Sequence, residues 1–203
     1  MYLTKRDKEI LYWIDKWGSI TINQCSKIFY SKNKEAYQQA RKRLKKLSDN
    51  NFLRRYRKDM KSETIYYLDK KLTLHDLKVF DIYAELISIG ATIKTFIPRY
   101  KINTPNSHKQ YRELDALIEF IYKDYFCPLI LEIDYTHFTT HQKIQDIYES
   151  EHFQDRYLKL IAEENIFPQI LIVRPFTFSN KINDETFNIS YTNFDSVSIQ
   201  DIL

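Results

Sequence analysis

Two carboxylates stand one residue apart at the end of an apolar run. In "LILEIDYTHF", residues 129–138, Glu132 and Asp134 follow side chains that are typical of a buried strand. Burying a carboxylate is costly unless a metal ion, a cation or hydrogen bonds compensate for the lost water. This placement therefore predicts a site that is either built to hold a divalent metal or neutralised by other side chains.

A third carboxylate and a lysine lie on either side of this pair in the sequence. Asp115 lies in a second apolar run, "ELDALIEF", and Lys143 follows the Glu132-Ile133-Asp134 triplet. Carboxylate oxygens suit Mg²⁺ or Mn²⁺, which prefer oxygen ligands. His137 and His141 are spaced i, i+4 but lack the Glu of a zinc-protease helix, so we interpret them as surface histidines.

The charge of the chain divides along its length. Residues 1–71 hold 19 Lys and Arg against 8 Asp and Glu, whereas residues 72–203 hold 12 against 19. The overall charge of +4 thus hides a basic part of +11 and an acidic part of −7. A polyanion is expected to bind the basic part.

Three helices are predicted in the basic part. Thr4 and Thr21 each precede a polar residue at capping-box spacing, and apolar residues recur behind them at helical intervals. A third helix over residues 34–47 carries an inward stripe of Tyr37, Ala40, Leu44 and Leu47. Its opposite face is expected to contact DNA with these residues: Lys34, Gln38, Arg41, Lys42, Lys45 and Lys46.

Two β-prone runs, residues 52–57 and 63–68, follow and predict a hairpin. The order of three helices and a basic hairpin resembles a winged helix-turn-helix domain, as does the run "QQARKRLKKLSDNNFLRRYRKD". The resemblance implies further contacts to phosphate or the minor groove from the wing, at Arg54, Arg55, Arg57, Lys58 and Lys61. A winged helix that binds protein is the alternative, because one fold hosts unrelated functions.

The acidic part reads as an α/β (α+β) arrangement. A helix capped by Thr73 is followed by β-rich runs at residues 92–97, halted by Pro98, at 114–121 and at 128–134. A mostly helical segment over 139–164 then carries Ile144, Ile147, Leu158 and Ile161 on one side, before a final strand, "QILIVRP". We place the boundary between the two domains after residue 71.

This αβββαβ order resembles the restriction-endonuclease-like, PD-(D/E)xK superfamily. Asp115 matches the first acid of its motif and Glu132 the second, but Asp134 stands where the superfamily has Lys. Because this Lys helps position the nucleophile, its replacement favours a domain without catalysis. If the site is active, the resemblance implies that Asp115, Glu132, Asp134 and Lys143 form it with Mg²⁺ or Mn²⁺; otherwise no cofactor is expected.

The whole pattern resembles the replication-relaxation family of bacterial mobile elements. The winged helix, "LTLHDLKVFDIYAEL" and the Glu132-Ile133-Asp134 triplet carry this resemblance over about residues 3–174. It implies a plasmid, phage or integrative-element protein that binds double-stranded DNA in replication, relaxation or conjugative transfer initiation. A metal-dependent DNA endonuclease and a transcriptional repressor of its own element are the alternatives.

The acidic domain is then expected to form a homodimer or to recruit a relaxase, replication or other element-encoded protein.

No apolar run reaches the roughly 18 residues that span a bilayer, and the N-terminus lacks the apolar core of a signal peptide. We therefore expect a cytoplasmic protein without a membrane partner. Residues 176–203 carry no functional signal.

Overall fold

The computed structural model describes the chain except for residues 106, 108, 136, 162–165, 176–180 and 195–203. It is a mixed α+β protein that divides into two compact units, Met1–Gly90 and Ala91–Leu203. The division differs from the predicted boundary after residue 71. Helix α4 (Leu74–Ser88) belongs to the first unit, because the Gln24 side chain donates to the Leu77 carbonyl at 2.9 Å and to Asp81 at 2.8 Å.

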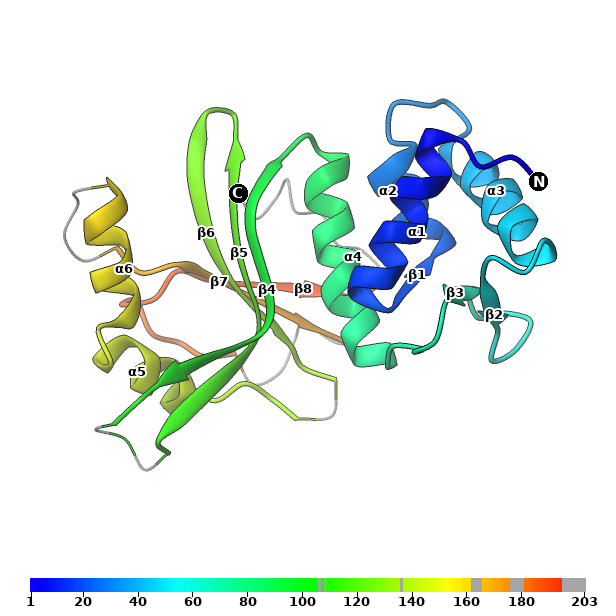
Figure 1. Ribbon diagram of the computed structural model, residues 1–203. Helices are drawn as coiled ribbons and strands as arrows, with labels where there is room; N and C mark the ends of the chain where they lie inside the picture. Colours follow the sequence, from blue (N-terminus) through cyan, green and yellow to red (C-terminus); the bar gives the residue numbers. More distant parts are fainter. Residues whose placement is uncertain (106, 108, 136, 162–165, 176–180, 195–203) are drawn as a thin grey trace. The chain divides into compact units, whose positions relative to one another are not determined.

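The first unit combines helices with a small antiparallel sheet (Figure 1). Its other elements are α1 (Lys5–Trp17), β1 (Ser19–Thr21), α2 (Ile22–Phe29), α3 (Ala36–Asp49), β2 (Arg54–Tyr56) and β3 (Ile65–Tyr67). The strand order is β1-β3-β2, so β3 pairs on both sides. The hairpin was predicted, whereas β1 was not.

The predicted capping residues begin the first two helices. Thr4 and Asp7 form a capping box at α1, and Thr21 and Gln24 form one at α2. Gly18 ends α1 with a φ of 96°, a conformation that favours glycine. Helix α3 begins at Ala36, so Lys34 lies just before the helix rather than in its first turn.

A buried ion pair joins the first and third helices. The Asp7 carboxylate is fully buried and accepts hydrogen bonds from the Arg43 guanidinium and from the Thr4 backbone and hydroxyl. Burial tends to raise the pKa of Asp7, but the hydrogen bonds from Arg43 and Thr4 outweigh it and lower the pKa to about 2. The side of α3 that carries Arg43, Ala40 and Leu44 therefore packs inward.

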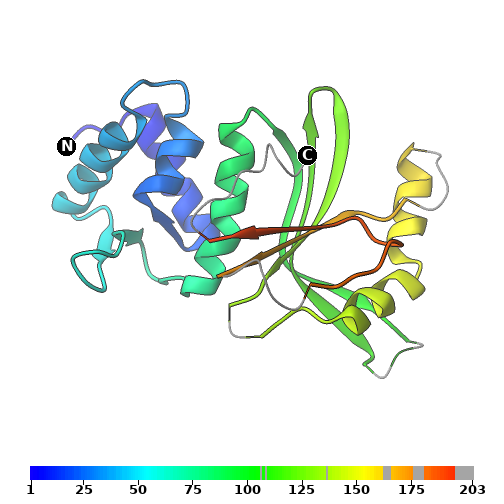
Figure 2. The same cartoon turned by 180° about the vertical axis from the view of Figure 1, so that it is seen from behind.

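The second unit contains a mixed sheet with helices (Figures 1 and 2). Its elements are β4 (Thr92–Asn103), β5 (Tyr111–Tyr122), β6 (Tyr125–Ile133), α5 (His141–Glu149), α6 (His152–Ile161), β7 (Gln169–Arg174) and β8 (Ile189–Asn193). Among the described residues the order is β4-β5-β6-β7-β8, antiparallel from β4 to β6 and parallel from β6 to β8. Strand β8 was not predicted.

Strand β4 is longer than expected because Pro98 does not end it. Pro98 pairs with Ala116 of β5, and the strand continues to Asn103. Proline lacks a backbone N–H, but it is tolerated at a sheet edge, and β4 is the edge strand. The next residue, Arg99, has a positive φ of 54°.

The predicted helical segment over 139–164 is two helices. Glu151, with a φ of 58°, lies between α5 and α6. Ile144 and Ile147 are buried as expected, but Leu158 is 47% exposed, and Phe153 and Tyr157 of α6 enter the core instead. The side chain of Ile161 and residues 162–164 lie outside the described part of the chain.

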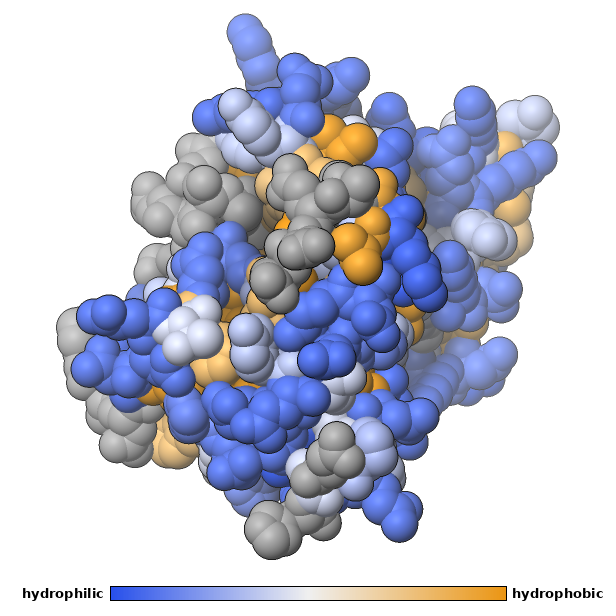
Figure 3. Space-filling view, turned by 90° about the vertical axis from the view of Figure 1, so that its left-hand side faces the viewer, coloured by the Kyte–Doolittle hydropathy of each residue, from blue (hydrophilic) through white to orange (hydrophobic). Residues whose placement is uncertain are grey.

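Helices α5 and α6 share one apolar core with strands β4 to β7. The surface around these helices is mainly hydrophilic, with separate hydrophobic patches (Figure 3). Within the described residues, none of the helices is both long and apolar enough to span a bilayer.

We expect Arg43→Ala to lower the free energy of unfolding by about 3 kcal/mol at pH 7, because it leaves the Asp7 carboxylate buried without its cation. A carboxyl whose pKa is lowered by folding stabilises the protein above the unfolded value of 3.8, and this contribution is lost as the pH falls to about 2. The difference between wild type and variant should therefore shrink between pH 4 and pH 2. Urea unfolding measures it, with Arg41→Ala, an exposed position on the same helix, as control; equal losses in both variants would contradict the role given to the pair.

Candidate functional site

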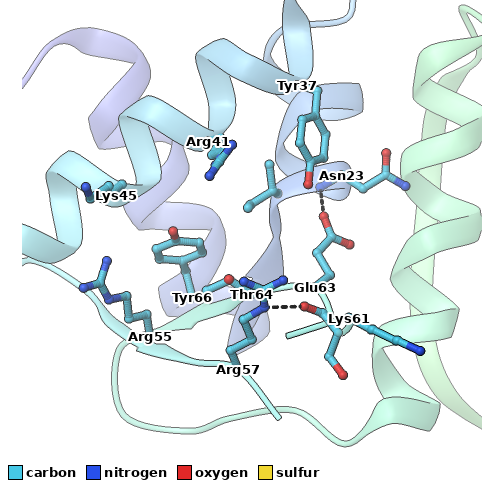
Figure 4. Close-up of a pocket in the computed structure, with 12 residues that line it drawn as sticks. Asn23, Tyr37, Arg41, Lys45, Arg55, Arg57, Lys61, Glu63, Thr64 and Tyr66 are labelled. Atoms are coloured by element: carbon cyan, nitrogen blue, oxygen red, sulfur yellow. Dashed lines mark hydrogen bonds between the residues drawn. The ribbon is translucent and has the colours of Figure 1, made fainter. Parts of the chain in front are cut away.

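A groove of about 670 Å³ lies between helix α3 and the hairpin of β2 and β3 (Figure 4). Its lining residues are Ile22, Asn23, Tyr37, Arg41, Lys45, Arg55, Arg57, Lys61, Ser62, Glu63, Thr64 and Tyr66. Cations from both sides face this groove, with Arg41 and Lys45 on α3 and Arg55 on β2. Such a groove attracts a polyanion.

All of the residues predicted to contact DNA are exposed. The groove brings together Arg41, Lys45, Arg55, Arg57 and Lys61. Outside its lining lie Lys34, Gln38, Lys42, Lys46, Arg54 and Lys58. Lys42 and Gln38 continue the exposed side of α3 beyond Lys45, because residues three and four positions apart are neighbours on a helix. The cationic surface is therefore wider than the groove.

The apolar stripe predicted that Tyr37 packs in the core, but this prediction is wrong. Its side chain is 43% exposed and lines the groove, whereas Ala40, Leu44 and Leu47 are buried. At about 100° per residue, Tyr37 stands at the margin of the apolar face, next to Arg41 one turn later. A tyrosine at this margin adds an aromatic face and a hydroxyl to the cationic groove.

The alternation of side chains in β2 divides its arginines. Arg55 lines the groove, whereas its neighbour Arg54 lies on the opposite face of the strand. Arg55 also forms an exposed ion pair with Asp49 at 3.5 Å, which contributes little to stability. Its charge remains close to the groove.

Arg57 is partly engaged within the hairpin. Its Nε donates to the Ser62 carbonyl at 2.7 Å, and another guanidinium nitrogen donates to the Met60 carbonyl. Sequence reasoning treated Arg57 only as a DNA contact. The structure gives it a second role in fixing the turn that joins β2 to β3.

One acidic side chain lies among these cations. The Glu63 carboxylate accepts a hydrogen bond from the Asn23 backbone N–H at 2.6 Å, in the first turn of α2 (Figure 4). Burial raises the pKa of Glu63, while this hydrogen bond opposes the change. Glu63 thus connects the hairpin to α2 and lines the groove. Neither Glu63 nor Asn23 was a predicted site residue.

The second candidate site contains the paired carboxylates at the end of β6. Lys143 of α5 reaches Glu132: its Nζ lies 2.7 Å from both carboxylate oxygens, with hydrogen-bond geometry to Oε2. Oε1 is buried without a hydrogen-bond partner among the described residues. Burial raises the pKa of Glu132 to about 7, despite the opposing effect of Lys143.

A second cation neutralises Asp134. Arg174, which ends β7 and is fully buried, donates to Asp134 Oδ2 at 2.6 Å. The other oxygen of Asp134 accepts from the Thr139 N–H at 2.8 Å and from its hydroxyl at 2.7 Å. Sequence reasoning missed Arg174, although it directly follows the apolar run of a predicted strand.

The Asp115 side chain, on β5, accepts a hydrogen bond from the backbone of the neighbouring strand β6. Its Oδ2 accepts from the Ile133 N–H at 2.6 Å, so the carboxylate bridges β5 and β6. Across the part of the chain that the structure describes, Asp, Glu, His and Cys side chains do not gather in groups of three or more suited to a metal ion. Hydrogen bonds and ion pairs compensate Asp115, Glu132 and Asp134 instead.

His141 and His152 lie in surface or boundary environments. His141 Nε2 lies 2.6 Å from Asp184, and hydrogen bonds from His141 and Thr186 lower the pKa of this carboxyl to about 2. His152 lies 2.7 Å from the Tyr100 hydroxyl, and burial lowers its pKa.

Comparisons of the chain with protein-family models, characterised proteins and solved structures give no significant match.

We expect the stability of the protein to decrease as the pH rises from 4.5 to about 7, because the folded state holds a proton on Glu132 that the unfolded state releases earlier. This decrease in the free energy of unfolding should be roughly 3 kcal/mol in the wild type and absent in the Glu132→Gln variant. Urea unfolding at pH 4.5, 6 and 7.5 measures the change. Glu113→Gln is the control, since this more exposed carboxylate pairs with Lys101 at 3.6 Å; a wild-type difference that Glu132→Gln leaves unaltered would refute the assignment.

Proposed function

We propose that this protein binds double-stranded DNA in a sequence-specific manner. The observation that carries the proposal is the groove between α3 and the hairpin, because cations from two separate elements line it. Phosphate contacts by Lys and Arg position a protein on the duplex, and side chains on an exposed helix read the edges of the bases.

In this proposal the first unit is a winged helix-turn-helix domain. Helices α2 and α3 follow each other and pack together, and the β1-β3-β2 sheet places a hairpin beside α3. Helix α3 is the recognition helix, and the hairpin is the wing. The buried face of α3 leaves Gln38, Lys42 and Lys45 free to enter the major groove, where Gln pairs well with adenine and cations with guanine or phosphate.

The second unit is proposed as a restriction-endonuclease-like domain without nuclease activity. Its antiparallel strands β4 to β6, followed by helices and a parallel strand β7, match the βββαβ part of the order expected for that core, whereas the helix expected before them, α4, belongs to the first unit. Arg174 holds Asp134 where a nuclease needs free metal ligands. The unit then serves dimerisation or recruitment of another replication or transfer protein, as the resemblance to the replication-relaxation family implies.

A metal-dependent nuclease is the second candidate function. The observation in its favour is that Lys143 lies 2.7 Å from Glu132, since a lysine beside an acidic residue is the part of the motif that the triplet lacks. In this alternative Asp115, Glu132 and Asp134 would hold a divalent ion, which would take the place of Lys143 at Glu132 and of Arg174 at Asp134. The DNA-binding and nuclease proposals predict different outcomes for the same DNA.

A mobility-shift titration on duplex fragments that flank the gene, against random duplex, separates these functions when Mn²⁺ is present and the DNA is checked for cuts. Selective binding with intact DNA supports the binding protein, and a site that overlaps a promoter indicates a repressor. Nicking that disappears in Glu132→Ala supports the nuclease. Equal, weak affinity for all fragments would refute sequence-specific binding.

We expect Lys42→Ala together with Lys45→Ala to weaken duplex binding and to reduce the slope of log affinity against log salt by about two, because two fewer counterions are released. Titration at four salt concentrations measures the slope. The matched control removes two exposed lysines of the second unit, Lys94→Ala with Lys123→Ala, and should retain the wild-type slope. An unchanged slope in the α3 variant would exclude this face of the helix from the interface.

A further inference from the structure

The turn between β2 and β3 is fixed by its own side chains. Asp59 Oδ1 accepts hydrogen bonds from the backbone N–H groups of Lys61 at 2.9 Å and Ser62 at 2.7 Å. Arg57 donates to the Met60 and Ser62 carbonyls from the other side. The turn therefore holds one conformation before any partner binds, and less entropy is lost on binding.

This ordered turn presents an apolar side chain. Met60 is 90% exposed, the largest exposed fraction given for a large hydrophobic residue of the described chain, and Lys58 and Lys61 beside it are exposed as well. Because Met60 is almost fully solvated, it adds little to the core, and its burial in a partner would be favourable. The surrounding lysines suit a partner that is apolar inside and anionic outside.

The position of Met60 relative to the groove restricts how it meets that partner. Lys61 and Ser62 line the groove between α3 and the hairpin, whereas Met60 is outside this lining. If α3 occupies a major groove, the turn of the hairpin beside it is the part of this unit that can meet the adjacent minor groove, which lies one phosphate backbone away. Lys58 and Lys61 are then placed to contact phosphates on either side.

We propose that Met60 is a wedge that enters the minor groove and partly unstacks one base step, so that this protein bends the DNA it binds. Apolar side chains, methionine among them, act in this way in proteins that kink DNA. Methionine is unbranched and polarisable, which lets it adapt to the edges of two bases. Pyrimidine–purine steps unstack most easily, so the wedge favours such a step at a position that α3 does not touch.

This inference rests on the proposed function, and the experiment separates the two. The full chain is titrated against the tightest-binding flanking duplex, with 2-aminopurine, whose fluorescence rises on unstacking, substituted at one adenine at a time. Dyes at the two ends of the duplex report bending by energy transfer. Wild-type protein should increase fluorescence at one step beyond the α3 contacts and bring the ends closer.

Met60→Ala should lose both signals and bind about tenfold more weakly, with an unchanged salt slope, because only apolar burial is removed. Met60→Leu should retain both signals, since leucine also serves as a wedge. Lys58→Ala with Lys61→Ala should reduce the salt slope by about two while keeping the fluorescence increase at saturating protein. The Met60 side chain is exposed, so these substitutions leave the core intact.

The outcomes are distinct. Absence of binding to any duplex overturns the proposed function and the wedge with it. Tight binding without a fluorescence increase at any position overturns the wedge alone, and so does a Met60→Ala variant that keeps wild-type fluorescence and bending.

Discussion

Helix α3 presents its cations on one side because its other side is packed against the rest of the first unit. The buried ion pair between Asp7 and Arg43 contributes to this constraint. If the Arg43 guanidinium moved away, the Asp7 carboxylate would remain buried without a cation, which is costly. Ala40, Leu44 and Leu47 add apolar packing on the same side. The direction of Arg41 and Lys45 follows from this packing, and with it the depth and charge of the groove.

The second unit also contains buried carboxylates that are paired with cations. Glu132 lies near the end of β6 and Asp134 directly follows this strand, and Lys143 and Arg174 form ion pairs with these two buried carboxylates. Neutralisation of this kind favours a fixed charge arrangement over a labile ligand set. Within one chain, the cations of α3 and the hairpin are therefore exposed in the first unit, whereas the carboxylates at the end of β6 are compensated internally in the second.

Local signals predicted much of this structure, and long-range pairings account for what they missed. The capping boxes at Thr4 and Thr21 involve residues three positions apart, so the sequence alone located both helix starts. Strand β1 is only three residues long, and its pairing partner β3 lies far along the chain. The approach of Arg174 to Asp134 depends on the parallel pairing of β6 with β7, which no local pattern reports.

The edge strand β4 carries a consequence for the behaviour of the protein in a crowded solution. Among the described strands β4 forms an edge of the sheet, and a sheet edge is where another extended chain can add. Pro98 has no backbone N–H to donate, and the positive φ of Arg99 interrupts the regular strand geometry beside it. The outer side of the strand is thereby a poor template for another strand, which limits edge-to-edge aggregation while the inner side keeps its pairing with β5.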